Sequence, residues 1–386
     1  MGKKFGCLLL VLLFVLHPIP ASAEEEPEIQ TPHAAVMEVS TGQILYEKGA
    51  DERVHPASVT KVMTLLLIFE ELEKGNLSLE DEVVTSAYAR SMGGSQVFLE
   101  EGEKQTVETL IKCIVIASGN DAAVAMAEHI AGTEQAFVDR MNQEADRLGM
   151  ENTHFVDCCG LTDSASHYTS ARDVAIASRE LLSRFPEVTE YSHIWMEDMT
   201  HVTSKGSSVF TLTNTNKLLR AFDGCDGLKT GSTSMAKYCL SATARRNGIR
   251  LISVVMTAPD SKTRFADAAT LLGYGFSRCT LYEDETMTPL SLVAVKGGVK
   301  DEAEVAYETG FSYLSTSGED FSGIEKHLEW QEDIRAPLKA GTRVGALVYT
   351  LEGQEIGRVS VIVKADIRKA GYLDCLYKTL LLWLDL

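Results

Sequence analysis

The spacing of apolar residues along the chain changes from alternating to helical and back again. Residues 33–48 alternate on both sides of Thr41-Gly42, which predicts a β-hairpin. Helical patterns follow in five segments: from about 58 to 75, 107–117, from 120 onward, 132–149 and 169–182. Strand patterns return at 209–212, 238–244 and 250–257, and a helical pattern follows at 261–272. We therefore expect an α+β fold with antiparallel strands.

The pattern changes character near residue 281. From 281 to 364, short alternating runs are separated by turns such as Glu352-Gly353, which predicts a small all-β domain. We therefore expect a first domain of helices and strands at 24–280 and a β domain at 281–364.

The last segment, residues 365–386, predicts an amphipathic helix. From Ile367 onward the apolar residues fit one helical face. They include Leu373, Leu376, Tyr377, Leu380, Trp383 and Leu384. The segment is too short and too charged to cross a bilayer, because Asp374, Lys378 and Asp385 interrupt it. Its Tyr and Trp residues suit a helix that lies at a membrane surface, and its nearly cancelling charges favour hydrophobic binding. Packing of the helix on the protein's own core is the alternative.

The first 23 residues have the features of a secretory signal peptide. Lys3 and Lys4 precede an apolar run at 7–16, and Ala21-Ser22-Ala23 resembles a cleavage site. A retained N-terminal anchor is the alternative, although the run is short for a membrane span. We expect an exported protein, either secreted or held peripherally at the outer face of the cytoplasmic membrane.

Composition narrows the class of protein. The chain has 386 residues, 45% of them hydrophobic, so it can bury a large core and is not disordered. Its formal net charge of −19 makes nucleic acid an unsuitable partner, because like charges repel. Once Cys7 leaves with the signal peptide, the remaining cysteines are widely spread and show neither CxxC nor His/Cys ligand spacing. We expect small buried thiols rather than a disulfide framework or a metal site.

The first candidate catalytic motif is Ser58-Val59-Thr60-Lys61, which follows Pro56 at the predicted start of a helix. Residues three positions apart share a helical face, so Ser58 Oγ and Lys61 Nζ can meet. A serine hydroxyl becomes a good nucleophile when a base removes its proton. Lysine can be that base when burial and a neighbouring cation make it neutral. Taken alone, the motif also fits a capping serine and a surface lysine.

The second candidate motif, Ser118-Gly119-Asn120, lies at the break between two helical patterns. Gly119 permits a sharp reversal, Ser118 can relay a proton and Asn120 can hold a substrate amide. The structural alternative is a helix C-cap followed by an N-cap.

The third candidate motif, Lys229-Thr230-Gly231, leads towards the strand predicted at Tyr238. A strand edge at this point could pair with an extended peptide. Lys229 would add positive charge near Lys61 and near a substrate carboxylate. As a tripeptide the motif is common and carries little information alone.

The order of these three motifs is the signature of penicillin-binding proteins and class A β-lactamases. The chain resembles the D-alanyl-D-alanine carboxypeptidases, the low-molecular-weight penicillin-binding proteins, over nearly the whole mature sequence. The specific stretches are HPASVTKVMT, ASGNDAAVAMAEH, HYTSARDVA, LTNTNKLL with DGLKTGST, and APLKAGTRVGAL. The resemblance implies a β-lactamase/DD-peptidase-like domain, in which helices flank an antiparallel sheet.

The resemblance also implies a reaction. Ser58 would be the acylated nucleophile and Lys61 its base, with Ser118 and Asn120 completing the proton network and the substrate contact. Ser58 would attack the carbonyl between two D-alanines of a peptidoglycan stem pentapeptide. Free D-alanine would leave, and water would hydrolyse the acyl-enzyme without a metal or an organic cofactor. Penicillin and other β-lactams would acylate the same serine.

The remaining implied roles concern substrate binding. Lys229 and Thr230 would bind the region of the terminal carboxylate. The backbone N–H groups of Ser58 and of Ser232, which follows Gly231, would form the oxyanion hole. Family members carry an arginine in the helix after the last core strands, and Arg264 stands there. An exposed helix residue beside Asp267 is the alternative for Arg264.

One stretch departs from the family pattern. Before Gly160-Leu161, relatives usually show Asn-Pro or a His-containing pair, and this chain has Asp157-Cys158-Cys159. The loop lies close to the active site in relatives. Its two thiols would either pack as small buried groups, which we expect, or make turnover sensitive to redox conditions.

Other functions stay open on sequence grounds. A DD-endopeptidase would cut cross-linked peptidoglycan by the same chemistry. A class A β-lactamase needs a glutamate-directed water, whereas residues 158–170 offer Asp163 and no glutamate. A non-catalytic protein that binds the wall or penicillin is disfavoured by the intact motifs.

Overall fold

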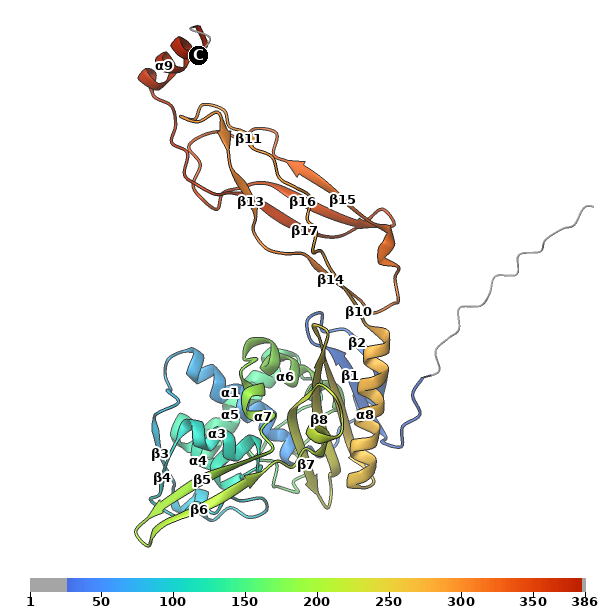
Figure 1. Ribbon diagram of the computed structural model, residues 1–386. Coiled ribbons are helices and arrows are strands. Elements are labelled where there is room, and N and C mark those ends of the chain that lie inside the picture. The colour runs from blue at the N-terminus through green and yellow to red at the C-terminus, as the bar shows by residue number, and fades with distance from the viewer. Residues whose placement is uncertain (1–25, 384–386) are drawn as a thin grey trace, which may run out of the picture.

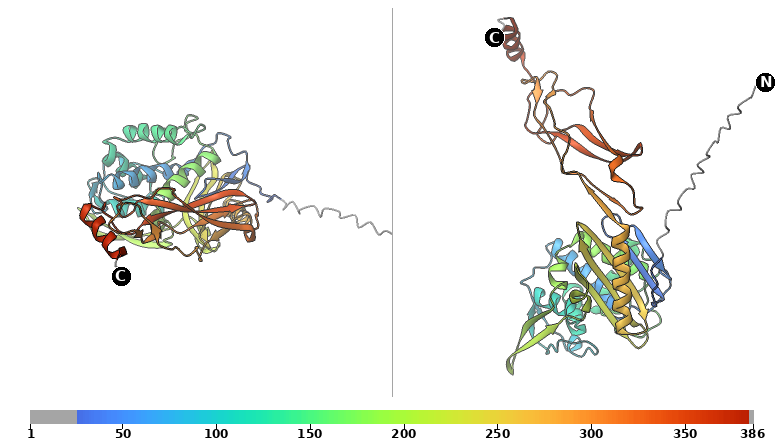
Figure 2. Two further views of the ribbon diagram at one scale, coloured as in Figure 1. Left: turned by 90° about the horizontal axis from the view of Figure 1, so that it is seen from above. Right: turned by 45° about the vertical axis from the view of Figure 1, so that its right-hand side comes forward.

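The structure, a computed structural model, describes residues 26–383 (Figure 1). The expected signal peptide, and Leu384 and Asp385 of the expected C-terminal helix, lie outside the described residues. The described chain forms a sheet-and-helix body, which ends with α8, and an elongated β body that carries α9 at its far end (Figure 1). Figure 2 shows the same two bodies from two further directions.

Five antiparallel strands form the central sheet of the sheet-and-helix body, in the order β2-β1-β9-β8-β7. They are β1 (His33–Glu38), β2 (Ile44–Lys48), β7 (Cys225–Thr233), β8 (Lys237–Arg246) and β9 (Ile249–Ala258). Successive side chains along a strand point to opposite faces, and both faces are buried here. On β1, Ala34 and Val36 join the cluster beneath α8 (Ser261–Arg278), whereas Ala35 and Met37 join the larger helical cluster. Helices therefore cover the sheet on both sides.

The larger helical layer is organised around α1 (Lys61–Glu73), which is buried along most of its length. It packs against three helices: α4 (Asn120–Ala131), α5 (Glu134–Leu148) and α6 (Ala171–Arg184). Shorter helices complete the layer: α2 (Ala87–Arg90), α3 (Val107–Val115), α7 (Val188–Ser192), and the 3₁₀ turns η1 (Ala57–Thr60) and η2 (Lys217–Arg220). Two antiparallel strand pairs lie outside the central sheet. They are β3 (Glu82–Val84) with β4 (Lys104–Thr106), and the hairpin of β5 (Met196–Thr203) and β6 (Gly206–Thr213).

Three local features differ from the sequence prediction. The helix expected from residue 58 begins as the 3₁₀ turn η1 and becomes α-helical at Lys61. The third motif lies within β7 rather than ahead of a strand. The strand expected at 209–212 is the end of a longer hairpin, whose partner β5 was not predicted. The reason is that β5 is polar and mostly exposed, so it lacks an apolar face that a pattern could detect.

The β body is built on a four-stranded antiparallel sheet in the order β13-β17-β16-β15. Its strands are β13 (Val305–Tyr307), β15 (Ile324–Trp330), β16 (Arg343–Leu351) and β17 (Gln354–Val363). Two further strand pairs belong to this body: β10 (Thr280–Glu283) with β14 (Ser312–Ser315), and β11 (Val293–Ala294) with β12 (Glu302–Ala303). The 3₁₀ turn η3 (Phe321–Gly323) precedes β15. The expected fold class, a helix-flanked antiparallel sheet followed by a small all-β unit, is confirmed.

The C-terminal helix, α9 (Tyr372–Trp383), begins later than the apolar pattern suggested. Ile367 pairs with Leu338 and is buried in the β body, so it is not part of the helical face. Lys378 ties α9 to the β body through the carbonyl of Gly298, at 2.9 Å. Six large apolar side chains of α9 are exposed: Tyr372, Leu373, Leu376, Tyr377, Leu380 and Trp383. Within residues 26–383, we find no helix both long and apolar enough to cross a membrane.

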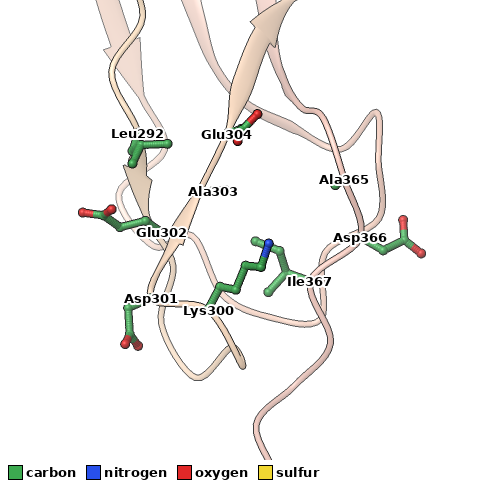
Figure 3. A pocket seen from close by; sticks show the side chains of 9 residues that line it. All are labelled: Leu292, Lys300, Asp301, Glu302, Ala303, Glu304, Ala365, Asp366 and Ile367. Atoms are coloured by element: carbon green, nitrogen blue, oxygen red, sulfur yellow. The ribbon is translucent and has the colours of Figure 1, made fainter. Parts of the chain in front are cut away.

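A cavity of about 520 Å³ opens in the β body (Figure 3). Asp301, which lines it, is hydrogen-bonded to Lys378 of α9. The cavity lies between β12 and residues 365–367. Lys300 points into it, whereas Asp301, Glu302 and Asp366 point outward (Figure 3). Residues of the three candidate motifs do not line it.

Candidate active site

The start of α1 brings together the serine and the lysine of the first motif. Lys61 Nζ lies 3.1 Å from Ser58 Oγ. Because η1 is a 3₁₀ turn, side chains three positions apart lie almost directly above one another. Ala57, just before Ser58, has a φ of +48°, a strained backbone conformation for a residue with a side chain. Lys61 is completely buried and Ser58 is half-buried.

Three oxygen atoms surround Lys61 Nζ. Besides its contact with Ser58, Nζ donates to Asn120 Oδ1 at 2.5 Å and to the carbonyl of Cys159 at 2.8 Å. The amide of Asn120 is oriented by its Nδ2, which donates to the carbonyl of Gly93 at 2.7 Å. The Asn120 and Cys159 oxygens can only accept hydrogen bonds. When the amine is neutral, these two oxygens can take its two N–H groups, which leaves its lone pair for the Ser58 hydroxyl.

Burial lowers the pKa of both lysines in the motifs. Loss of hydration lowers the pKa of Lys61, although the nearby Asp157 and Asp121 oppose this shift. The pKa of Lys229 lies well below its ordinary value, because the side chain is buried and lies near the positive charges of Lys61 and Arg264. The site therefore favours a neutral amine next to the serine.

The third motif lies against the first. Gly231 brings β7 close to η1, since a Cβ at this position would lie 2.9 Å from the backbone nitrogen of Ser58. Thr230 Oγ1 lies 2.6 Å from Thr215 Oγ1, and Lys229 Nζ donates to the Thr230 carbonyl at 3.1 Å. Ser232, the next residue of β7, is exposed. Segments distant in sequence thus meet at one site.

Arg264 reaches the same end of β7 from α8. Its Nη1 donates to the carbonyls of Gly231, at 3.1 Å, and Cys239, at 3.2 Å. The side chain is buried, which lowers the pKa of the guanidinium, and its buried Nε has no hydrogen-bond partner among the described residues. The alternative of an exposed Arg264 beside Asp267 is therefore wrong. The Asp267 carboxylate instead accepts hydrogen bonds from the backbone and hydroxyl of Thr31.

The second motif is only partly joined to the others by hydrogen bonds. Ser118 is buried with a φ of +63°, and Asn120 is the first residue of α4. Asn120 contacts Lys61 directly. Over residues 26–383, no hydrogen bond links the Ser118 hydroxyl to Ser58, Lys61 or Lys229. Ser118 thus lies two residues before Asn120, which contacts Lys61, but Ser118 itself is not hydrogen-bonded to the lysine.

The loop at 157–162 belongs to the site. The resemblance placed this loop close to the active site, but the sequence reasoning assigned it no role. The carboxylate of Asp157 accepts the backbone N–H groups of Cys159, Gly160 and Thr162, which fixes the carbonyl of Cys159 against Lys61. Burial would raise the pKa of Asp157, but His167 and these N–H groups lower it overall. The only sequence signal was the departure from the family pattern at this stretch.

The two thiols of this loop are poorly suited to a chemical reaction. Cys158 and Cys159 are completely buried and unpaired, and burial raises the pKa of the Cys158 thiol. A thiol that stays protonated is a poor nucleophile. These observations support packing rather than redox sensitivity, and the loop contributes a backbone carbonyl to the site.

Comparisons with known proteins agree with this site. A family model described as D-alanyl-D-alanine carboxypeptidase matches residues 20–260, and a model of the penicillin-binding protein 5 C-terminal domain matches residues 276–369. Fold and site together define a serine peptidase that acts on the cell wall. The chain belongs to the D-alanyl-D-alanine carboxypeptidase family.

Individual relatives cover nearly the whole chain. D-alanyl-D-alanine carboxypeptidase DacF of Bacillus subtilis is 41% identical over 354 residues, which span 91% of this chain and 89% of the relative. DacC of Escherichia coli is 32% identical and spans 93% of this chain and 90% of the relative. The crystal structure of penicillin-binding protein 5 from Haemophilus influenzae has a TM-score of 0.66 at 31% identity, covering 89% of this chain and 99% of that chain. The resemblance inferred from the motifs is confirmed.

Proposed function

We propose that this protein removes the terminal D-alanine from peptidoglycan stem pentapeptides through an acyl-enzyme on Ser58, and that penicillin acylates the same residue. One observation carries the proposal: Lys61 Nζ lies 3.1 Å from Ser58 Oγ in a fully buried position that lowers the lysine's pKa. A neutral amine can accept the serine proton as the hydroxyl attacks the peptide carbonyl.

Acylation would use the groups around this pair. Asn120 Oδ1 and the Cys159 carbonyl hold the two N–H groups of Lys61, so its lone pair takes the Ser58 proton. The proton then passes to the leaving D-alanine amine, for which we propose Ser118 as the relay. Water subsequently hydrolyses the ester on Ser58 and releases the shortened stem peptide.

Substrate binding would use β7 and its surroundings. We assign the oxyanion hole to the backbone N–H groups of Ser58 and Ser232, because Gly231 allows β7 to approach η1 closely. Lys229, Thr230 and Arg264 would bind the terminal carboxylate. The buried charge of Arg264 at the end of β7 supports this assignment.

Penicillin tests the proposed nucleophile. We expect a covalent adduct on the wild-type protein, detected by mass spectrometry of the intact chain. The adduct should be absent from Ser58→Ala and should persist in Ser312→Ala, which removes an exposed hydroxyl in the β body. A wild-type protein without an adduct would instead support a non-catalytic wall-binding role.

Product analysis separates the two peptidase activities. A carboxypeptidase releases free D-alanine from a defined pentapeptide, whereas a DD-endopeptidase splits a cross-linked peptide dimer. Incubating the full-length protein with each compound and weighing the products measures both activities. We propose the carboxypeptidase activity, and conversion of the dimer alone would contradict it.

For location, we propose export through the signal peptide at 1–23 and peripheral membrane attachment through α9. The exposed apolar side chains of α9 support this attachment. We also propose that residues 24–280 and 281–364 are separate domains. Of the expected membrane segment at 365–386, we propose only α9 for membrane contact, because Ile367 is buried in the β body.

Removing Lys369–Leu386 should release the mature protein from membranes without loss of activity on soluble peptides, because the candidate motifs lie in the other body. Sedimentation with lipid vesicles measures the binding. The double variant Leu376→Gln with Leu380→Gln keeps the chain length and should also bind less. A truncated protein that still pellets with vesicles must have another anchor.

A further inference from the structure

A second cavity, of about 400 Å³, lies between the loop that contains Phe98 and the β5–β6 hairpin. Phe98 and Phe210 form its apolar part, with ring centroids 5.8 Å apart in an edge-to-face arrangement. Val209 and Gly206 also line the cavity, and its polar side comprises His201, Thr203, Ser207, Ser208, and the Lys205–Glu100 ion pair at 2.7 Å. The size is suitable for a small ligand.

One wall of this cavity is tied to the active site through α4. The carboxylate of Asp121, the neighbour of Asn120, accepts the backbone N–H groups of Val97, at 3.2 Å, and Leu99, at 3.1 Å. Phe98 lies between these two anchored residues. Its backbone is therefore fixed next to the helix end that contacts Lys61.

The opposite wall is tied to the active site through β6. Thr215 contacts Thr230 of the third motif. Phe210 precedes Thr215 by five residues, which limits their backbone separation to about 17 Å even if fully extended. Both walls of the cavity are thus connected to residues of the candidate active site, one through Asp121 and the other through Thr215.

Phe98 has two unusual properties for an aromatic residue. Its φ is +63°, which is an outlier for a bulky side chain, and the side chain is 63% exposed. A strained backbone costs free energy, and exposure means that little packing offsets the cost. Such strain is concentrated at ligand-binding sites.

We propose that this cavity binds the amino-sugar unit to which the stem peptide is attached. A sugar ring presents apolar C–H faces, which suit Phe98 and Phe210, and hydroxyl and amide groups, which suit the polar side of the cavity. A purely apolar ligand would leave those polar groups without partners. An extended pentapeptide spans about 17 Å, and the proposal requires the sugar at its amino end to occupy this cavity while the D-alanines lie at Ser58. The inference rests on the proposed function, which supplies the substrate.

The test compares two substrates of the full-length protein: a free stem pentapeptide, and the same pentapeptide carrying its amino-sugar disaccharide. We expect the wild type to prefer the sugar-linked form in kcat/KM by about three- to tenfold, mainly through KM. Phe98→Ala should bring the ratio of the two kcat/KM values towards one. Lys205→Ala should lower the ratio by a smaller amount.

Val84→Ala is the matched control, because Val84 is an exposed apolar residue on β3 outside the cavity. It should keep the wild-type ratio. The subsite is refuted if the wild type shows no preference for the sugar-linked substrate. It is also refuted if Phe98→Ala slows both substrates equally, since that pattern indicates that Phe98 acts only through the backbone segment that Asp121 anchors. Penicillin acylation distinguishes the two failures. A wild type that is acylated but shows no sugar preference refutes only the subsite, whereas a wild type that is not acylated refutes the proposed function.

Discussion

Replacing Lys61 with methionine is expected to slow the acylation of Ser58 by penicillin by about 10²- to 10⁴-fold. Methionine has a similar length and fills the buried space, but it has no lone pair that can take the serine proton at 3.1 Å. Lys61→Arg should be equally impaired, because a guanidinium stays protonated. Time courses of adduct formation, followed by mass spectrometry, measure the rate.

The pH dependence of the same reaction provides a second readout. Burial lowers the pKa of Lys61 from its ordinary value of 10.5, so the neutral amine appears at lower pH than for an exposed lysine. The acylation rate of the wild type should therefore rise with pH through this lowered pKa and then level off. Lys112→Met on α3 replaces a lysine that forms ion pairs with Glu108 and Glu197 outside the site, and it should keep the wild-type profile. Wild-type rates in a folded Lys61→Met protein would contradict the proposed base.

Local spacing was sufficient to predict that Ser58 and Lys61 can meet, since residues three positions apart share a helical face. The choice of this pair over a capping serine and a surface lysine came from the order of the three motifs. The 3₁₀ turn at η1 preserves this contact, so the error in helix type did not matter. The helical layer was also predicted from the apolar pattern, because α6 has periodic apolar positions and α1 is apolar along most of its length, as a helix buried in the core requires.

Contacts between distant segments could not be derived from spacing. The approach of Gly231 to Ser58 depends on how β7 packs against η1, and only the resemblance to a family suggested it. The role of the Cys159 carbonyl was not foreseen at all, because a backbone oxygen leaves no trace in the residue types of a motif. The resemblance also implied a Ser118 contact that the hydrogen bonds do not show, while the buried position of Arg264 agrees with it.

Gly160→Ala, in the loop that supplies the Cys159 carbonyl, is expected to destabilise the protein by about 2–5 kcal/mol. Gly160 has a φ of +75°, and a Cβ there would lie 1.8 Å from the carbonyl oxygen of Ala57 and 2.7 Å from Thr60 Oγ1. Neither the loop nor η1 can move away without disturbing the Cys159 carbonyl or Ser58. We therefore expect a lower midpoint of thermal unfolding, together with penicillin acylation reduced by about tenfold or more, because the contact that orients Lys61 is displaced.

Gly149→Ala separates the steric clash from the backbone strain. Gly149 follows α5 with a φ of +72°, nearly the same as at Gly160, but a Cβ there would meet no atom within 4 Å. This variant carries only the cost of a left-handed alanine, about 1–2 kcal/mol, and should keep wild-type acylation. If the two alanine variants lose the same stability and both acylate normally, the close packing of the 157–162 loop against Ala57 is not what holds Lys61 in position. A larger loss at Gly160, accompanied by slow acylation, would show that this loop positions the base.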